Sequence, residues 1–331
     1  MSTQRILYLA LFLLVLFSLL QLGGGTIEID WKQLGPASRD ELSYQVFWYI
    51  RLPKLIAALL SGALLSFSGL LLQTYFKNPL ADPSVLGISS AAGLGAATWI
   101  MSSASLPLLM YFPQELGLSL SACIFAFLSL LLLIFFSSFL RNKSSLLVSG
   151  ILLSSFSSAL VLYLQFQSGK EELQRYILWT MGDLTAIGWS ELMILLGIGL
   201  FGVLYLFLQS QPMNILLMGP VEAKNLGIST QKLQIQILIS TSVLSALIMS
   251  FCGPIGFVGM AIPHLSRMLF RTYKHQILIP ASLILGALFL VICQYIADHL
   301  IAGKSIPVNM ISAFLGAPLV LWFLYKKGLD Y

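Results

Sequence analysis

Charged residues are scarce in this chain of 331 residues, since Asp, Glu, Lys and Arg together make up only 9% of it. Soluble globular proteins carry about 25% of these residues. The composition therefore argues against a water-soluble fold and favours a protein with several membrane-spanning segments. The net charge of +5 is small and comes from scattered cations, so we interpret it as a sign of membrane topology and expect no nucleic-acid partner.

Cysteine and histidine are also rare, with Cys at three positions and His at three. Cys123, Cys252 and Cys293 each lie within an apolar run and show no CxxC spacing, which argues against a disulfide or a metal site. The sequence contains no Walker A motif, no Ser-His-Asp pattern and no zinc-protease pattern. We therefore expect no catalytic site, no bound metal and no cofactor in this chain.

Apolar residues, by contrast, are abundant and make up 58% of the chain. A helix needs about 20 of them to cross a bilayer, so the length allows about ten spans with short loops. We predict an all-α polytopic membrane protein in which residues 1–331 form a single transmembrane domain. The predicted spans are 5–22, 48–75, 84–101, 117–140, 144–166, 190–209, 233–251, 256–270, 277–297 and 307–325.

The first apolar run, residues 6–20, could instead be a signal peptide. No convincing small-x-small cleavage site follows it, so we interpret it as an uncleaved first span. With the N-terminus in the cytoplasm, more Lys and Arg fall at inner than at outer span ends, which is the expected direction. Both termini are then cytoplasmic, and the protein lies in a bacterial inner or plasma membrane.

One predicted inner loop, residues 211–231, is polar enough to leave the bilayer and still has helical spacing of apolar residues. Gly219-Pro220 interrupts the pattern, and Gly227 can end the second piece as a C-cap. An ordinary interfacial connector explains this pattern. A short helical hairpin that docks into another protein explains it equally well.

The stretch RLPKLIAALLSGALLSFSGLLLQTYFKNPLADPSVLGISS, residues 51–90, carries more polar and small residues than a membrane anchor needs. Gly62, Ser66 and Gly69 fall on one helix stripe, where small residues let another helix approach closely. Gln73 continues near that stripe and predicts either an interhelical hydrogen bond or a contact with a transport pathway.

The polar end of the same stretch predicts a sharp turn at the inner face. Asn78-Pro79 and Asp82-Pro83 force extended backbone and end the helix. Asp82 can also cap the start of the next helix near Ser84.

A second informative stretch runs from residue 251 to 268 and contains GPIGFVGMAIPHLSR. Its Gly-Pro pair breaks one span at the outer surface, and Pro263 lies inside the next helix, where proline bends the axis. His264 and Arg267 share a face and can satisfy freed carbonyls or hold a neighbouring loop. We expect these residues to support a hinge or gate.

These two stretches together closely resemble the permease family of type II ABC importers, which carry ferric siderophores, haem and cobalamin. The resemblance extends to LWTMGDLTAIGW at residue 178, to LLMGPVEAKNLGIS in the inner loop and to IPVNMISAFLGAP near the end. It covers nearly the whole chain, in the expected order. The chain is therefore identified as a member of that family.

The resemblance implies that the inner loop is a coupling helix region that seats on an ATPase subunit. The implied docking residues are Gly219, Glu222, Ala223, Lys224, Leu226 and Gly227. The family usually has an acidic residue directly after the glycine and an Arg later, whereas this chain has Pro220 and Lys224. Docking of the helix is compatible with these departures, whereas the particular ion pairs are in doubt, because Lys is not equivalent to Arg at a bidentate site.

On the outer side, the resemblance implies that Arg51 and Lys54 receive acidic residues from the two lobes of a substrate-binding protein. Exposed opposite charges steer such docking. These cations could instead anchor a span at the lipid headgroups. A third basic family position falls on Asp298, and an acidic one falls on Gln294, so the third contact is in doubt unless Lys304 compensates.

We therefore predict a permease subunit with a second permease subunit, two ATPase subunits that use ATP, and a binding protein as partners. The predicted cargo is a ferric siderophore, with haem, cobalamin or molybdate as alternatives. The spans beginning near Ser84, Ser144, Gly256 and Pro307 are candidates for lining the pathway. An ion-coupled secondary transporter is disfavoured because the spans lack midplane carboxylates. An intramembrane enzyme is disfavoured because His264 has no nucleophile or metal-ligand partner.

Overall fold

A computed structural model describes residues 3–24, 29–35, 38–39, 41–102, 113–140, 143–185, 187–301 and 305–327. Over these residues the chain is almost entirely helical, which confirms the predicted all-α polytopic class. The helices that correspond to the ten predicted spans are α1 (Thr3–Gly23), α3 (Leu52–Phe76), α4 (Ile88–Ser102), α5 (Gln114–Phe139), α6 (Lys143–Gln167), α8 (Trp189–Leu208), α11 (Thr230–Cys252), α12 (Val258–Phe270), α13 (His275–His299) and α14 (Val308–Lys327).

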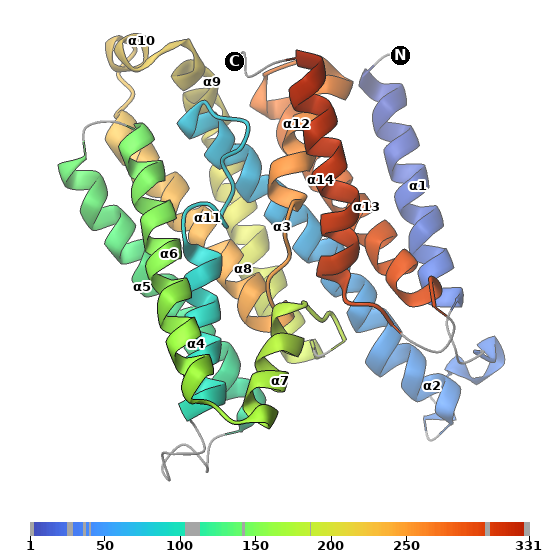
Figure 1. The fold of residues 1–331 in the computed structure, drawn as a ribbon. Helices are drawn as coiled ribbons and strands as arrows, with labels where there is room; N and C mark the ends of the chain where they lie inside the picture. The colour runs from blue at the N-terminus through green and yellow to red at the C-terminus, as the bar shows by residue number, and fades with distance from the viewer. Residues whose placement is uncertain are drawn as a thin grey trace.

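Seven helices among the described residues are long and apolar enough to cross a membrane. Helix α4 is apolar but has only 15 residues, and α12 has only 13; in α14 the apolar stretch is Val308–Phe323. These short helices still stand in the bundle beside the long ones (Figure 1). They are kept there by packing against neighbouring helices, because a short helix alone could not span the apolar core.

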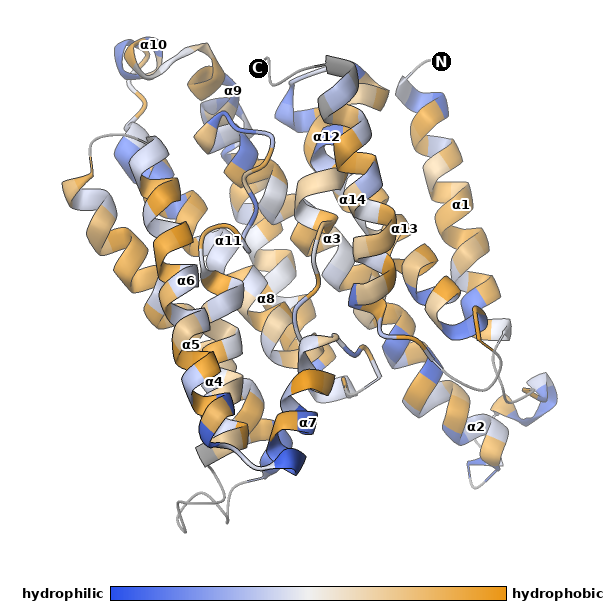
Figure 2. Ribbon diagram, in the orientation of Figure 1, coloured by the Kyte–Doolittle hydropathy of each residue, from blue (hydrophilic) through white to orange (hydrophobic). Residues whose placement is uncertain are grey.

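Helix α3 runs through the middle of the molecule and is its most buried element. It packs against α13, α12 and α11, while α1, α5, α6 and α8 present most of their apolar residues outward. Figure 2 shows that residues along the middle of the helices are mostly hydrophobic and that hydrophilic residues gather toward the two ends of the bundle. Such a surface suits lipid as the surrounding solvent.

Both chain ends lie at one end of the bundle, together with two short helices, α9 (Ser210–Met218) and α10 (Pro220–Asn225) (Figure 1). This is the end that the topology prediction assigns to the cytoplasm. At the opposite end lie α2 (Leu42–Val46) and α7 (Lys170–Thr180). An even number of spans requires the two termini to share a side, as observed.

Three details differ from the sequence prediction. Helix α7 was not predicted, because its 11 residues are amphipathic and begin with charged residues rather than forming an apolar run. Two elements before α3 extend its helix toward the outer end, namely α2 and a π-helical turn, η3 (Phe47–Arg51). A 3-10 turn, η1 (Trp31–Leu34), lies before them. Helix α4 begins at residue 88 rather than 84, since residues 83–87 form turns.

Candidate functional site: the small-residue core and the inner loop

The glycine stripe of α3 makes direct backbone contact with two other helices. A Cβ placed on Gly62 would overlap the carbonyl oxygen of Gly286 in α13, and one on Gly69 would overlap that of Gly259 in α12. Ser66 is fully buried on the same stripe, and its Cβ lies close to Gly286. The close helix approach that the sequence predicts therefore occurs at two crossings, where the backbone of α3 contacts that of α13 and that of α12.

Gln73 lies one turn below the second crossing and is completely buried. Its Nε2 donates to the carbonyl oxygens of Gly259 and Met260, at 3.2 and 3.0 Å. Its Oε1 accepts a 2.6 Å hydrogen bond from the guanidinium of Arg267. Of the two roles left open by the sequence, the structure shows the interhelical hydrogen bond. The amide thus ties α3 to both ends of the α12 segment.

Helix α12 contains Pro263 in its interior and begins just after Phe257, which has a left-handed backbone with φ of 67°. His264 is half-buried and lies against the ring of Phe323 in α14, with 4.7 Å between ring centroids. His264 and Arg267 therefore face different neighbours, α14 and α3. The predicted support role at a hinge or gate stays a prediction.

The turn at the end of α3 is built from the predicted Asn-Pro and Asp-Pro pairs. Asn78 Oδ1 accepts from the backbone N–H of Leu80 at 2.9 Å, and Asp82 Oδ2 accepts from the backbone N–H and hydroxyl of Ser84. Asp82 therefore caps a turn and not the next helix, which begins four residues after Ser84. Pro79 and Pro83 lie in the same turn.

The Asp82 carboxyl is buried and lies beside Gly259, so that a Cβ on this glycine would overlap Oδ1. Burial raises the pKa of Asp82, and the two hydrogen bonds from Ser84 oppose that shift only in part. The turn thus packs a carboxyl against the α3–α12 crossing, beside the first turn of α12.

The inner loop forms a short helical hairpin, one of the two interpretations that the sequence left open. Helix α9 ends at Gly219, which has φ of 141°, and Pro220 opens α10. A Schellman motif closes α10: Gly227 N–H donates to Lys224 O, and Ile228 N–H donates to Ala223 O. Gly227 has the left-handed φ of 79° that this motif requires. The predicted break and C-cap are both confirmed.

The tip of this hairpin is the exposed part. Ala223 is buried, whereas Glu222 and Lys224 are exposed. Large apolar side chains accompany these charges, namely Met218, Val221 and Leu226, with exposures of 68%, 65% and 60%. An apolar patch with a polar rim at the end of a bundle is a surface suited to a protein partner.

Polar contacts hold α9 to the ends of α3 and α13, and sequence reasoning did not find them. Asn214 Oδ1 accepts from the backbone N–H of His275 at 2.9 Å and lies 2.7 Å from its Nδ1. The Nε2 of this buried histidine lies 2.9 Å from the hydroxyl of Thr74. Lys77 Nζ donates to the carbonyl oxygen of Leu217 at 3.0 Å. A lone histidine at an inner helix end was the available sequence signal.

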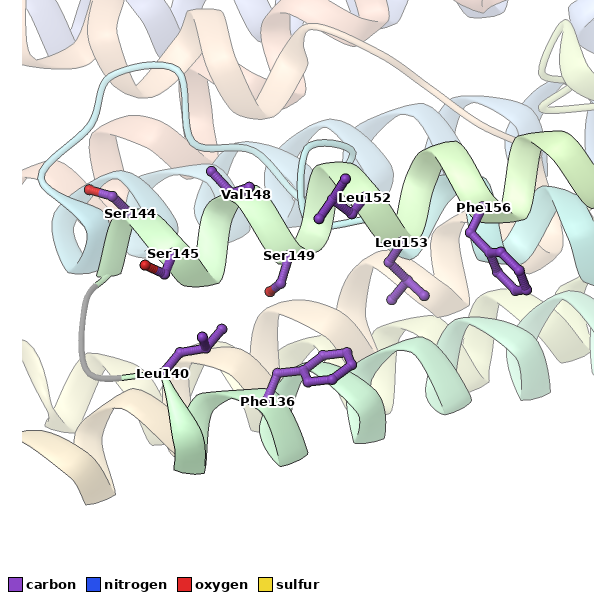
Figure 3. A pocket seen from close by; sticks show the side chains of 9 residues that line it. All are labelled: Phe136, Leu140, Ser144, Ser145, Val148, Ser149, Leu152, Leu153 and Phe156. Carbon is purple, nitrogen blue, oxygen red and sulfur yellow. The ribbon is translucent and has the colours of Figure 1, made fainter.

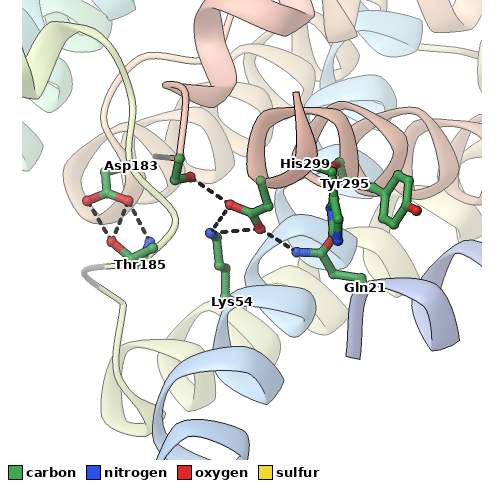
Figure 4. A network of polar contacts seen from close by, with 8 residues as sticks. Gln21, Lys54, Asp183, Thr185, Tyr295 and His299 are labelled. Atoms are coloured by element: carbon green, nitrogen blue, oxygen red, sulfur yellow. Dashed lines mark hydrogen bonds and ion pairs between the residues drawn. The ribbon is translucent and has the colours of Figure 1, made fainter. Parts of the chain in front are cut away.

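At the outer end, Lys54 is buried and forms an ion pair with Asp298, with 2.6 Å between Nζ and Oδ1. The same carboxylate accepts from Gln21 Nε2 and Ser305 Oγ, each at 2.6 Å. Figure 4 shows Lys54 and Gln21 converging on this carboxylate. Arg51 is also buried and donates to the carbonyl oxygen of Leu22 at 2.8 Å.

These contacts change what can be expected of the predicted docking cations. Arg51 and Lys54 bond within the chain, and each residue is only about 8% exposed. Asp298 occupies the position at which the family pattern has a basic residue, and it is the ion-pair partner of Lys54. Gln294 is buried in α13, and Lys304 lies outside the described residues. Docking of a binding protein on Arg51 and Lys54 stays a prediction, and it would require Lys54 to leave or share this pair.

A groove of about 650 Å³ lies between α5 and α6. Phe136 of α5 and Leu140, just after the end of α5, line one side, and a mixed set from α6 lines the other (Figure 3). The α6 residues are Ser144, Ser145, Val148, Ser149, Leu152, Leu153 and Phe156. The serines lie in the first two turns of α6 and apolar side chains line the rest of this wall, on a helix that the sequence nominated for the pathway.

The sequence model of the FecCD transport family matches residues 12–326. The chain belongs to the FecCD transport family. It is a multi-pass membrane permease subunit of an ABC importer, in which the ATPase belongs to a separate subunit. The similarity extends along nearly the whole chain, so the crossings, the inner hairpin and the outer network all lie within the family domain.

Individual relatives of this FecCD permease support the assignment. The chain is 32% identical over 325 residues to the hemin transport system permease protein HmuU of Yersinia pestis, covering 96% of this chain and 95% of that one. It is 34% identical over 328 residues to the vitamin B12 import system permease protein BtuC of Salmonella arizonae, covering 97% and 94%. A solved structure described as an inward-facing conformation of a metal-chelate type ABC transporter matches with a TM-score of 0.85 and 32% identity, covering 98% and 99%.

Proposed function

We infer that this FecCD permease carries a metal chelate inward across the membrane, with a ferric siderophore as the first candidate. It would pair with a second permease subunit, either identical or closely related, to form the pathway between them. Two ATPase subunits would dock on the inner hairpins, and a substrate-binding protein would deliver the cargo to the outer end.

The observation that carries this proposal is the construction of the α9–α10 hairpin. Its base is anchored, since Met213 and Leu216 of α9 are buried. Its tip is exposed and apolar around Val221 and Leu226. An element with a fixed base and an open tip can pass a displacement of a docked ATPase subunit into the bundle. ATP binding would thereby bias the permease between outward- and inward-open states.

The cargo class rests on the relatives and on the groove. One relative is named for hemin, one for vitamin B12, and the solved neighbour for metal chelates. Haem and cobalamin are therefore supported as well as a siderophore, and an oxyanion such as molybdate remains the outlying candidate. The serines and phenylalanines of the α5–α6 groove suit a large cargo with both polar and apolar faces.

A secondary transporter driven by an ion gradient is the competing function. Such a protein uses carboxylates near the bilayer midplane. Among the described residues of the spans, Asp298 is near the outer end of α13 and is already paired with Lys54. Glu191 sits in the first turn of α8 and accepts from the backbone N–H of Gly188. Neither of these two carboxylates has the position that ion coupling requires. The buried Asp82 lies in the turn between α3 and α4, where Ser84 donates two hydrogen bonds to it, so an Asp82→Asn variant that keeps cargo uptake would exclude it as an ion-coupling carboxylate.

The test is uptake by a strain lacking this gene, supplied in turn with labelled ferric siderophores, haem and cobalamin. Wild-type chain should restore uptake of one cargo. A Leu226→Asp variant should not, and the ATPase should no longer co-purify with it. Leu42→Asp is the matched control, because Leu42 is equally exposed at the opposite end of the molecule; it should keep the ATPase bound. Unchanged uptake of all three cargoes would overturn the chelate assignment, and ATPase retention by Leu226→Asp would overturn the docking assignment.

A further inference from the structure

Helix α9 can pass motion into the bundle by two routes. One is covalent, through α8 on its N-terminal side and through α10 into α11 on the other. The second route is non-covalent and runs across the chain, from α9 to the inner ends of α3 and α13. Its polar contacts join residues 61 and 201 positions apart in sequence, so they are not consequences of chain continuity.

The hydrogen-bond directions of this second route can be assigned from the donors and acceptors present. The backbone N–H of His275 can only donate, so the atom of Asn214 facing it must be the oxygen, Oδ1. The Asn214 amide nitrogen, placed by that choice, donates to Gln276 Oε1 at 2.9 Å. Because Oδ1 can only accept, the Nδ1 of His275 must carry the proton.

With the proton on Nδ1, the Nε2 of a neutral His275 is an acceptor. The hydroxyl of Thr74 can fill it, at 2.9 Å, or can turn to the carbonyl oxygen of Leu70 in its own helix, at 2.8 Å. When the Thr74 hydroxyl donates to Nε2, the buried imidazole is bonded on both nitrogens, one facing α9 and the other facing α3. His275 is completely buried, so water does not compete for these bonds.

The elements at the far side of this chain of bonds are in direct backbone contact with one another. Helix α3 is locked to α13 at the Gly62–Gly286 crossing and to α12 at the Gly69–Gly259 crossing. Backbone-to-backbone contact of this kind leaves no side chains between the helices to rearrange. A force applied at the base of α13 and the end of α3 therefore acts on a three-helix unit.

We propose that Asn214, His275 and Thr74 are positioning residues. Their hydrogen bonds make α9 and the α3–α12–α13 unit move as one rigid body. This inference rests on the proposed function, since the force comes from an ATPase docked on the hairpin tip. The three side chains lie away from the exposed tip of the hairpin, and they act through the helices that they join. The covalent route through α8 and α11 then serves mainly as the tether of the hairpin.

The first test uses the assembled importer in lipid nanodiscs, with spin labels on the exposed positions Gln211 of α9 and Lys274 before α13. In the wild-type chain, the distance between these labels should be the same without nucleotide and with ATP bound. In the Thr74→Val and Asn214→Ala variants, it should differ between the two states. A wild-type distance that shifts with ATP would overturn the proposal, because α9 would then move separately from α13.

The second test measures cargo imported per ATP hydrolysed in proteoliposomes. Thr74→Val should lower this ratio about fivefold, the factor that one neutral hydrogen bond represents, while basal ATP hydrolysis and complex assembly stay unchanged. Thr241→Val is the matched control, since the buried Thr241 hydroxyl bonds only carbonyls of its own helix α11 among the contacts found. Restoring a hydroxyl with Thr74→Ser should recover coupling.

The two levels of failure are distinguishable. If the chain binds no ATPase, the proposed function fails and neither ratio can be measured. If the complex assembles and transports but Thr74→Val equals Thr241→Val, the proposed function stands and the present inference is wrong.

Discussion

Substituting Gly69 by alanine should weaken the bundle, although the same change on an open helix face should strengthen it. Gly69 lies where α3 touches the backbone of α12, and an added Cβ would overlap the Gly259 carbonyl oxygen. Gly197 in α8 is also a mid-helix glycine, but a Cβ there meets no atom within 4 Å. Gly197→Ala is therefore the matched control for Gly69→Ala.

The opposing contributions can be compared directly. Alanine is favoured over glycine within a helix by about 1 kcal/mol, which both variants gain. At Gly69 this gain is offset by overpacking, which costs about 1–3 kcal/mol when neighbouring backbone must shift. The Gly259 oxygen also accepts from Gln73, and displacing it removes a hydrogen bond that contributes about 1 kcal/mol. The two variants should therefore differ by about 2–4 kcal/mol in free energy of unfolding, with opposite signs relative to the wild type.

The assay is equilibrium unfolding of the purified chain in mixed micelles with increasing SDS, followed by circular dichroism. Gly69→Ala should unfold at lower SDS than the wild type, and Gly197→Ala at the same or higher SDS. The larger Gly69→Leu should also lose transport. If the two alanine variants unfold together, the α3–α12 crossing is not in backbone contact and the reasoning about a rigid three-helix unit fails.

Three further predictions concern buried polar groups. Lys54→Met should lower the free energy of unfolding by about 3 kcal/mol because it leaves the Asp298 carboxylate buried without its cation. In a double-mutant cycle, the Lys54→Met/Asp298→Asn variant should recover most of this loss. Additive losses from the two substitutions would contradict a buried ion pair. Gln73→Leu should lower the free energy of unfolding in SDS by about 1–3 kcal/mol. The loss should exceed that of Gln236→Leu, whose amide bonds only a partly buried tyrosine hydroxyl among the contacts described. Equal losses would argue against the hydrogen bonds of the Gln73 amide to three partners. Burial raises the pKa of Asp82 above its unfolded value, so the fold favours the protonated carboxyl. The free energy of unfolding of the wild type should therefore fall as pH rises from the unfolded pKa through the raised pKa. Asp82→Asn should flatten this pH dependence, and an unchanged pH dependence in the variant would assign it to another group.

Much of the fold was predictable because membrane spans depend on a simple local property, a run of apolar residues. The predicted range 277–297 and the observed His275–His299 differ by two residues at each end. The hairpin break at Gly219-Pro220 was equally legible, since both residues act on their own backbone. Helix α7 escaped because an amphipathic interfacial helix has no apolar run to find.

The site was predictable in its residue types but not in its pairings. The small residues of α3 indicate a close contact, yet nothing local names Gly286 and Gly259 as the partners. Asp298 looked like a departure from the family pattern, whereas in the fold it neutralises Lys54, 244 positions earlier. Such pairings are set by which helices become neighbours, and that is a property of the whole bundle rather than of any segment.

The outer network has a consequence for how the protein is made. Gln21 finds its carboxylate partner 277 residues later in the chain, which at about 5–20 residues per second is roughly 14–55 s of synthesis. During that interval α1 and the start of α3 must remain in the membrane with an amide and a lysine whose final partner does not yet exist. The lysine can stay at the headgroups while it waits. The last third of the polypeptide thus supplies the hydrogen-bond and ion-pair partner of the first third. A chain truncated before α13 would leave the translocon with Gln21 and Lys54 lacking this carboxylate.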